Sequence, residues 1–211
     1  MVLREKTYKI IKERIVSGQY RPGQPLNEKE IIEELNISRT PFREAVHALN
    51  EENLVQIFPN RGIFVRELTF SDITNGFNIR YLLEPYVVEL ASVRMPKRVM
   101  EELIKRIEEV DRSDYSALLA EDDHFHTALL QYVDNNQLSR IMMNLYEYNH
   151  FQVVLIDDTA TDYIRNIRTS SVYQSLDEHK AILNHMLSGD TPGAVKAMQE
   201  HIINAKKRLL Q

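Results

Sequence analysis

The stretch ISRTPFREA, residues 37–45, decides the fold that we expect for this chain. Ser38 belongs to the residue types that cap helix N-termini, and Pro41 falls in the first turn, where its missing N–H costs nothing. The apolar residues that follow have the i, i+3, i+4, i+7 spacing of a helix core face: Phe42, Ala45, Val46 and Leu49. Arg39 and Arg43 recur on roughly the opposite side. The pattern therefore predicts a helix with one packed face and one face free to touch phosphates and bases.

The segment before this stretch predicts two further helices. Apolar residues up to Ile15 lie at helical spacing, and the glycine-containing turns that follow end the first helix. Asn27 and Glu30 have the spacing of a capping box, which opens the second helix and its apolar residues through Leu35. Asn36 tolerates the left-handed backbone conformation that a tight helix-to-helix turn demands. The second and third helices should therefore cross sharply, as in a helix-turn-helix.

The segment after the third helix predicts a β-hairpin. Residues 55–58 and 63–66 are strand-like runs, and the turn PNRG, residues 59–62, joins them. A hairpin in this place would be the wing of a winged helix-turn-helix. Asn60 and Arg61 would then lie at the tip of the wing.

The free helix face and the wing carry the candidate contacts to double-stranded DNA. Arg43, one turn into the helix, can offer a bidentate fork to guanine O6 and N7, whereas Arg39 and the N-terminal amides are placed to hold phosphates. Arg61 can enter the minor groove or grip the DNA backbone. The full set of expected DNA contacts is Ser38, Arg39, Thr40, Arg43, Asn60 and Arg61. The alternative for the two helix arginines is a merely solvated face.

Composition limits the kinds of protein that this chain can be. The 211 residues, 43% of them hydrophobic, suffice for two modest domains, and no apolar stretch approaches the roughly 20 residues that span a bilayer. The N-terminus carries charges early and lacks the apolar core of a secretory signal, so we expect a cytoplasmic protein. Cysteine is absent, which excludes disulfides and thiolate metal sites.

The net charge of −5 is unevenly distributed along the chain. Residues 1–70 contain 11 basic and 10 acidic side chains, whereas residues 71–211 contain 15 basic and 21 acidic ones. The acidity therefore belongs to the second part of the chain. The nearly neutral first part gives little electrostatic support for DNA binding, so the motif carries that interpretation.

The second part of the chain, from about residue 71, has an almost uninterrupted helical pattern. Six or so helices are expected, over about residues 71–94, 96–110, 113–133, 137–157, a fifth ending near Ser188 and a last from Thr191 to the C-terminus. Residues 158–171 are polar and are expected to be turn-rich, and Thr191 is expected to cap the last helix. No strand pattern competes, so residues 71–211 should form an all-helical antiparallel bundle and the chain should be mainly α.

One acid and three histidines in the second part form a candidate metal site. Asp122 and His126 are four residues apart and therefore project from the same helix face about one turn apart. His179 and His201 are equidistant from residue 190, in the turn between the last two helices, so an antiparallel hairpin would place them at the same height. One carboxylate and three neutral imidazoles suit a divalent transition metal, with zinc or nickel expected over magnesium.

Residues 6–68 resemble the winged helix-turn-helix domain of GntR-type bacterial transcription regulators. The matching residues are Gly18, Pro22, Gly23, Leu26, Glu28, Ser38 to Ala45, Leu49, Leu54, Val55 and Pro59 to Gly62. Asn36, Phe42 and Asn53 depart from the usual pattern. None of these departures removes a residue that would touch DNA.

Residues 71–210 resemble the effector-binding helical domain of the FadR branch of that family, called the FCD domain. The matching residues are Arg80 to Glu84, Asp122, Phe125, His126, Asn135, Leu138, Glu178, His179, Gly189, Asp190, Ala194 and His201. The resemblance implies that the acid and the three histidines of the candidate site hold a metal, and that a small carboxylate binds at or beside it. Arg80 is then a candidate partner for the effector carboxylate through bidentate hydrogen bonds. The alternative for Arg80 is an ion pair with Glu84 one turn away.

These features predict a ligand-controlled repressor or activator rather than an enzyme. An organic acid bound in the bundle would bias helix packing and change the distance between the two recognition helices of a homodimer, which would bind a two-fold symmetric operator. A metal-dependent hydrolase or lyase is the runner-up, although no general base is clearly placed. A metal that only stiffens the bundle is the third possibility.

Overall fold

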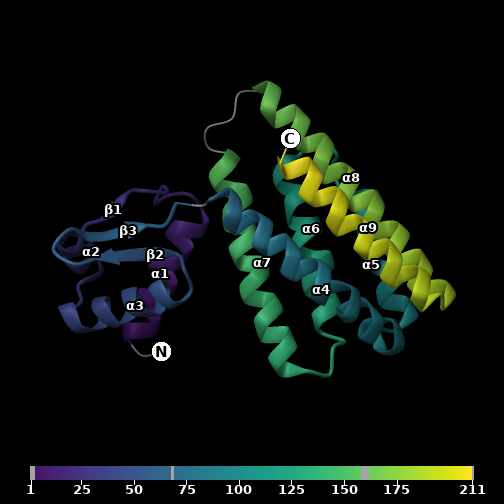
Figure 1. Ribbon diagram of the computed structural model, residues 1–211, viewed down its shortest axis with the longest axis horizontal. Coiled ribbons are helices and arrows are strands. Elements are labelled where there is room, and N and C mark those ends of the chain that lie inside the picture. Colours follow the sequence, from purple (N-terminus) through teal and green to yellow (C-terminus); the bar gives the residue numbers. More distant parts are fainter. Residues whose placement is uncertain (1–2, 68, 158–161, 211) are drawn as a thin grey trace. The chain divides into compact units, whose positions relative to one another are not determined.

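The computed structural model describes residues 3–67, 69–157 and 162–210 (Figure 1). Side chains are described outside residues 147–169 and residue 210. No helix in these described ranges combines the length and the apolarity that a membrane crossing would need.

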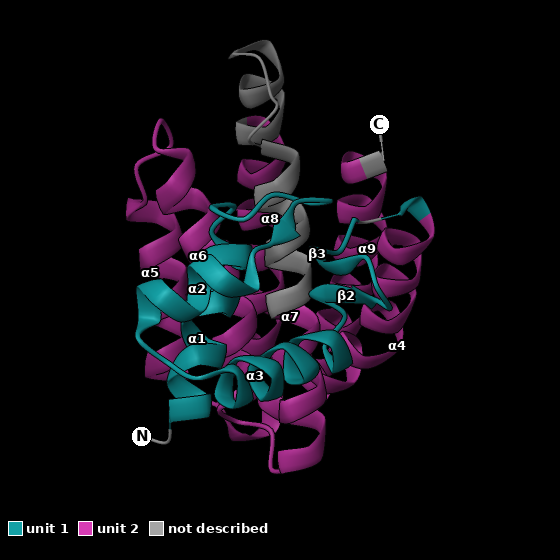
Figure 2. Ribbon diagram, turned by 90° about the vertical axis from the view of Figure 1, so that its left-hand side faces the viewer, with its two compact units in different colours: residues 1–70, 147–159 teal, residues 71–146, 160–211 magenta. Residues whose placement is uncertain are grey.

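Contacts between Cα atoms divide the chain into two compact units (Figure 2). The first, which we call the N-terminal unit, comprises residues 1–70 and 147–159. The second, which we call the helical unit, comprises residues 71–146 and 160–211.

Within residues 3–67, the N-terminal unit contains three helices and a small antiparallel sheet. These elements are, in chain order, α1 (Leu3–Val16), β1 (Pro25–Leu26), α2 (Glu28–Leu35), α3 (Arg39–Glu51), β2 (Val55–Phe58) and β3 (Gly62–Val65). The strands pair in the order β1-β3-β2, with Val55 opposite Val65 and Phe58 opposite Gly62. The predicted winged helix-turn-helix is confirmed. Strand β1 is an addition, because two residues are too short to show an alternating pattern in a sequence.

The turn between α2 and α3 follows the predicted chemistry, with one exception. The side chain of Asn27 accepts hydrogen bonds from the backbone N–H groups of Lys29 and Glu30, while its own amide donates to the Glu30 carboxylate. Asn36 adopts the left-handed conformation, with φ 49° and ψ 52°. Ser38 has the extended backbone of an N-cap residue, but its side chain makes no capping hydrogen bond. Helix α3 therefore begins where predicted, without the expected hydroxyl cap.

An apolar core holds α3 in place within the N-terminal unit. Its most deeply buried side chains come from α1, α3 and the sheet: Ile11, Ile15, Phe42, Leu49, Val55 and Val65. All four apolar residues predicted for the core face of α3 are buried. Because that face is packed, the opposite face of the helix keeps its polar side chains toward solvent.

The described residues of the helical unit belong to six helices, which Figure 1 labels. In chain order they are α4 (Phe70–Arg94), α5 (Lys97–Glu109), α6 (Tyr115–Leu130), α7 (Asn136–Asp157), α8 (Asp162–Ser188) and α9 (Thr191–Leu210). Among the described residues, α8 and α9 form the most extensive helix pair, an antiparallel hairpin, and α5 and α6 both pack against α8. The described part of the chain thus agrees with the predicted all-helical bundle.

The predicted turn-rich segment before the last two helices is wrong where the structure describes it. Residues 162–171 belong to α8 instead. Their polar composition suggested a loop, but they include no glycine or proline that would break a helix. Residues 158–161 of the same prediction lie outside the described residues.

The cap of α9 lies one residue earlier than predicted. Asp190, rather than Thr191, is the capping residue: its carboxylate accepts a hydrogen bond from the backbone N–H of Gly193 at 3.0 Å. The carbonyl of Asp190 also accepts the first intrahelical bond, from Ala194. Both threonine and aspartate favour this position, so residue type alone could not decide between them.

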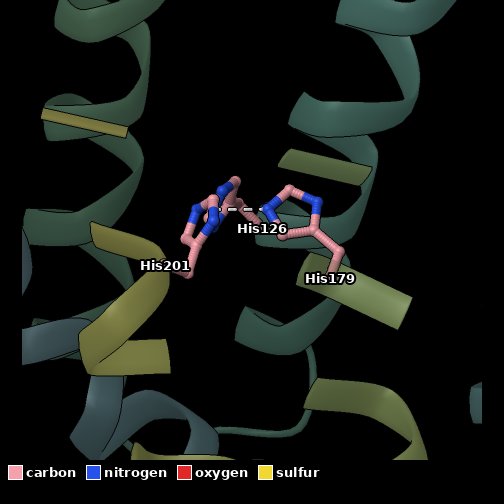
Figure 3. Close-up of side chains that lie close together, drawn as sticks. All are labelled: His126, His179 and His201. Carbon is pink, nitrogen blue, oxygen red and sulfur yellow. Dashed lines mark hydrogen bonds between the residues drawn. The ribbon is translucent and has the colours of Figure 1, made fainter. Parts of the chain in front are cut away.

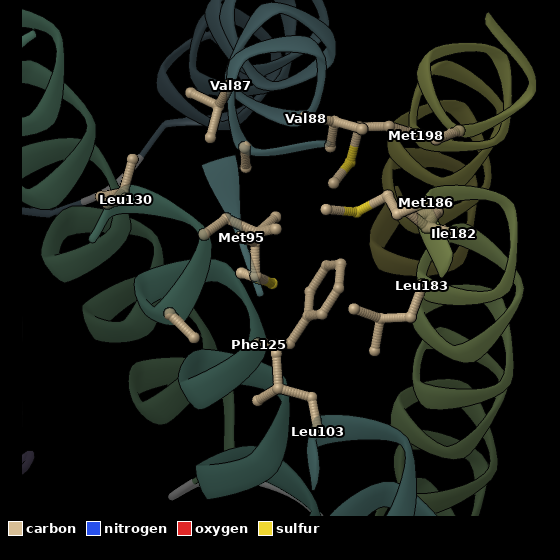
Figure 4. Packing of buried hydrophobic residues seen from close by; sticks show 14 of the residues in the cluster. Val87, Val88, Met95, Leu103, Phe125, Leu130, Ile182, Leu183, Met186 and Met198 are labelled. Atoms are coloured by element: carbon tan, nitrogen blue, oxygen red, sulfur yellow. The ribbon is translucent and has the colours of Figure 1, made fainter. Parts of the chain in front are cut away.

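The core of the helical unit surrounds Phe125 (Figure 4). It draws on α4, α5, α6, α7, α8 and α9, with members that include Val87, Val88, Leu103, Leu130, Met142, Ile182, Leu183, Met186 and Met198. In α5 the buried apolar residues are Met100, Leu103 and Ile107, whereas Val99 and Val110 are only partly buried. The ring of Phe125 stacks on His179 with a centroid distance of 3.9 Å. The apolar core therefore continues directly into the candidate metal site.

Candidate nucleic-acid interface and candidate metal centre

The polar face of α3 is accessible to solvent. The side chains of Arg39 and Arg43 are 80% and 64% exposed. Ser38 and Thr40 are exposed at the start of the same helix. Four of the predicted DNA contacts therefore share one accessible surface at the N-terminal end of α3, where the helix dipole favours an anion.

Glu28 of α2 also lies beside this surface. Its Oε1 atom is 3.8 Å from Nε of Arg39 and 3.8 Å from Nε of Arg43. All three residues line one hollow between α2 and α3. A single carboxylate thus offsets part of the repulsion between two neighbouring cations. The only signal in the sequence is that Glu28 stands in the first turn of α2, next to the tight turn of the motif.

The wing presents the two remaining predicted contacts. Asn60 has a left-handed backbone with φ 61°, and both Asn60 and Arg61 are exposed. The guanidinium of Arg61 lies 5.7 Å from the ring centroid of Phe58, within the range of a cation–π contact. These two residues remain predicted DNA contacts.

Three histidines from three helices meet inside the helical unit (Figure 3). His126 of α6, His179 of α8 and His201 of α9 are 4%, 0% and 1% exposed. Each offers one ring nitrogen, and these three nitrogens all lie within 4.8 Å of one another. The Nε2 atoms of His179 and His201 are 3.2 Å apart. The expectation that the α8–α9 hairpin places these two residues at one height is therefore confirmed.

Asp122 lies one turn before His126 on α6 and completes the predicted set. Its Oδ1 atom is 3.8 Å from Nε2 of His179, and its side chain is 28% exposed. Asp122 is thus the most accessible member of the group. Partial burial raises the pKa of its carboxyl, while the neighbouring His126 and His201 act in the opposite direction.

The donor set fits a divalent transition metal. Burial lowers the pKa of His179 well below its usual range, and the pKa of His201 is lowered for the same reason. Both imidazoles are therefore neutral near pH 7 and keep a lone pair, which metal binding requires. Two ligand atoms that are each about 2.0–2.1 Å from a tetrahedral ion lie about 3.3 Å from each other. The 3.2 Å between the two Nε2 atoms is close to that spacing.

Arg80 of α4 is buried beside the histidine cluster and pairs with Glu84. Its Nε donates to the Glu84 carboxylate, and its Nη2 lies 3.4 Å from Nε2 of His126. The ion pair that was the alternative for Arg80 is therefore formed, and the guanidinium also touches the cluster. Burial alone would raise the pKa of Glu84, but the charge of Arg80 and the proximity of His126 lower it to about 2.

Two family models match this chain. The model for bacterial regulatory proteins of the gntR family matches residues 3–65, and the model for the FCD domain matches residues 76–204, more than half of the chain. A winged helix-turn-helix followed by a helical FCD domain thus defines a bacterial transcription regulator. The chain belongs to the GntR family of DNA-binding transcriptional regulators and carries an FCD domain.

Named relatives agree with this classification, and a solved structure shares the fold. The HTH-type transcriptional repressor RspR of Escherichia coli is 32% identical over 134 residues, which cover 62% of this chain and only 59% of RspR. The Uxu operon regulator of Haemophilus influenzae is 27% identical over 96% of this chain and 80% of its own length. A crystal structure described as a transcriptional regulator GntR from Rhodococcus has the same fold, with a TM-score of 0.78 at 24% identity over 100% of this chain and 98% of its own. These families and relatives are regulators, not enzymes.

Proposed function

We propose that this chain regulates transcription by binding a two-fold symmetric DNA operator as a homodimer. The observation that carries the proposal is the α3 face, because its apolar side is packed while Arg39 and Arg43 face solvent beside the helix N-terminus. Arg43 would contact a guanine, whereas residues 38–40 and residues 60–61 of the wing would hold the backbone or the minor groove. Two such readers in one dimer add affinity because the second contact becomes intramolecular.

We propose further that Asp122 and the three histidines of the cluster hold a zinc or nickel ion. The burial of the imidazoles and the short separation of their nitrogens support this assignment. A metal bound there would supply open coordination positions for an exogenous carboxylate. Arg80 has five N–H donors and uses only some of them on Glu84, so it would donate further hydrogen bonds to the same carboxylate.

The effector in this proposal is a small organic acid that changes the affinity of the dimer for its operator. Such an acid can act only if it binds two arrangements of the protein with different affinities. Whether the acid strengthens or weakens DNA binding would decide between an activating and a repressing role. A metal that merely stiffens the bundle would give no response to any acid.

The experiment is a selection of DNA duplexes from a random-sequence pool, followed by fluorescence anisotropy with the enriched duplex. We expect one sequence with two-fold symmetry, and an affinity that changes about 5- to 150-fold with one acid from a panel of small hydroxy and keto acids. Treatment with a chelator should remove the response to the acid. Failure to enrich any sequence would reject the DNA reader. A metal-dependent rise in melting temperature with no response to any acid would show that the metal is structural.

A further inference from the structure

Glu178 of α8 lies behind one of the clustered histidines. Its Oε2 accepts a hydrogen bond from Nδ1 of His201 at 2.7 Å. The other ring nitrogen of His201, Nε2, is the atom that lies 3.2 Å from His179. Because Nδ1 and Nε2 point to different sides of an imidazole ring, Glu178 stands outside the cluster. It contacts a candidate ligand without being one.

The carboxylate of Glu178 is itself held firmly by α9. The two Nη atoms of Arg208 donate to its two oxygens, each at 2.8 Å, and the Asn204 amide donates to Oε1 at 2.9 Å. Arg208 also donates to the hydroxyl of Ser175 at 2.9 Å. This bidentate geometry is the most specific way in which a guanidinium can orient a carboxylate. Arg208 lies in the last turn of α9, so the network joins that turn to the histidine cluster.

The network determines where the proton of His201 resides. The Glu178 carboxylate forms its bidentate pair with the guanidinium of Arg208, a group that stays positively charged in proteins. An ionised carboxylate can only accept, so Nδ1 of His201 must carry the proton and Nε2 must present its lone pair to the cluster. His179 differs, because its buried Nδ1 has no hydrogen-bond partner among the described residues.

We propose that Glu178 is a positioning residue for metal binding, and that Arg208 is the anchor that holds Glu178 in place. This inference rests on the proposed metal site. Carboxylates in this outer position orient a ligating imidazole and increase its basicity, and their loss typically weakens metal binding about 10- to 100-fold. Arg208 contacts Glu178 rather than the imidazole of His201, so the loss of Arg208 should weaken metal binding by a smaller factor.

The test compares Glu178→Gln, Arg208→Gln and the control Glu200→Gln in the full chain. Glu200 precedes His201 as Glu178 precedes His179, but its side chain is 64% exposed and faces Lys196. Competition of Zn²⁺ and Ni²⁺ with a chelator gives the affinity of each variant. We expect Glu178→Gln to bind about 10- to 100-fold more weakly than wild type, Arg208→Gln to fall between, and Glu200→Gln to match wild type.

Two further measurements separate positioning from a purely structural role. Melting of the metal-free proteins reports stability, and the visible absorption of bound Co²⁺ reports the geometry of its ligands. Positioning predicts a changed Co²⁺ spectrum in Glu178→Gln while the metal-free melting temperature stays near that of wild type. If Glu178→Gln does not fold, Arg208→Gln gives the same comparison.

Different failures have different meanings. A wild-type affinity together with an unchanged Co²⁺ spectrum in both variants would overturn the inference and leave the metal site intact. Loss of affinity that is fully accounted for by loss of metal-free stability would also overturn it. Failure of the wild-type chain to bind any of the three ions would overturn the proposed metal site and the inference together.

Discussion

The recognition face of α3 and the histidine cluster place their functional groups in opposite surroundings. Arg39 and Arg43 are 80% and 64% exposed, and the carboxylate between them is 3.8 Å from each. His179 and His201 are at most 1% exposed, and their facing nitrogens are 3.2 Å apart. The first region keeps its charges in water until a partner arrives. In the second region, the lone pairs of the imidazole nitrogens are already buried away from water before any ligand binds.

This difference shows two ways of preparing a binding site. Exposed ion pairs contribute about 0–1 kcal/mol, so the arginines of α3 can leave Glu28 for a phosphate or a base with little loss of free energy. A buried polar atom without a partner costs about 1–3 kcal/mol, so clustered imidazoles gain from any ligand that satisfies them. The α3 face can therefore exchange its ion-pair partner at little cost, whereas the imidazoles of the candidate metal centre already lie together in the interior.

The largest expected effect is on the buried side of the comparison. Combining Asp122→Ala with His126→Ala should reduce the metal content from about one ion per chain to near zero, because two of four ligands are lost. Operator binding should survive, since α3 and the wing are unchanged, while the response to the acid should be blunted. Elemental analysis of the purified proteins measures the first effect. The exposed histidine variant His185→Ala is the control, and undiminished metal in the double variant would reject the ligand assignment.

The next largest effect is expected in the exposed DNA-binding region, where two arginine variants distinguish base recognition from contact with the DNA backbone. Arg43→Ala should relax the preference at one base pair by about 1–3 kcal/mol. Arg61→Ala should instead weaken binding to all DNA sequences alike, and the slope of log affinity against log salt concentration should fall by about one. Binding to a set of operator variants at several salt concentrations measures both. Arg98→Ala, an exposed arginine on α5, serves as the control. An unchanged base preference in Arg43→Ala would contradict the assignment.

A smaller effect is expected from Glu28→Gln, which removes the carboxylate between the two arginines. Affinity for random-sequence DNA should rise a few-fold, because one negative charge leaves the face that approaches phosphates. The ratio of operator to random-sequence affinity should fall, because the arginines lose the group that aligns them. Glu33→Gln, which lines the same hollow, is the matched control. An equal gain in affinity for operator and random-sequence DNA would show that Glu28 does not align Arg39 and Arg43.

The smallest effect is expected at the cap of α9. Hydrogen bonds from Gly193 and then His185 lower the pKa of Asp190 below its ordinary value of 3.8. The contribution of this carboxylate is therefore present above about pH 4 and is lost as the pH falls through the folded-state pKa. Asp190→Ala should lower the urea midpoint slightly at neutral pH, with the difference from wild type shrinking on acidification. The exposed variant Asp134→Ala is the control, and a difference that persists at low pH would argue against the cap.

Much of the fold could be predicted because its determinants are local. The capping box of Asn27, the left-handed Asn36 and the apolar spacing of α3 depend only on neighbouring residues. The common height of His179 and His201 also follows locally, from the symmetry of one turn. The errors arose where local signals were ambiguous, as in the polar start of α8 and the choice between Asp190 and its neighbour as the cap.

The amino-acid sequence by itself determined the helix-turn-helix, the wing, the helical second part and the four candidate metal ligands, because helical periodicity and turn chemistry repeat over a few residues. Only the tertiary structure decided which charges meet across helices. It brought Glu28 to both arginines of α3, placed Arg80 of α4 against His126 of α6, and set Glu178 between His201 and Arg208. Such pairings depend on how each helix is rotated about its axis and how it crosses its neighbours, and a periodic pattern leaves both of these open.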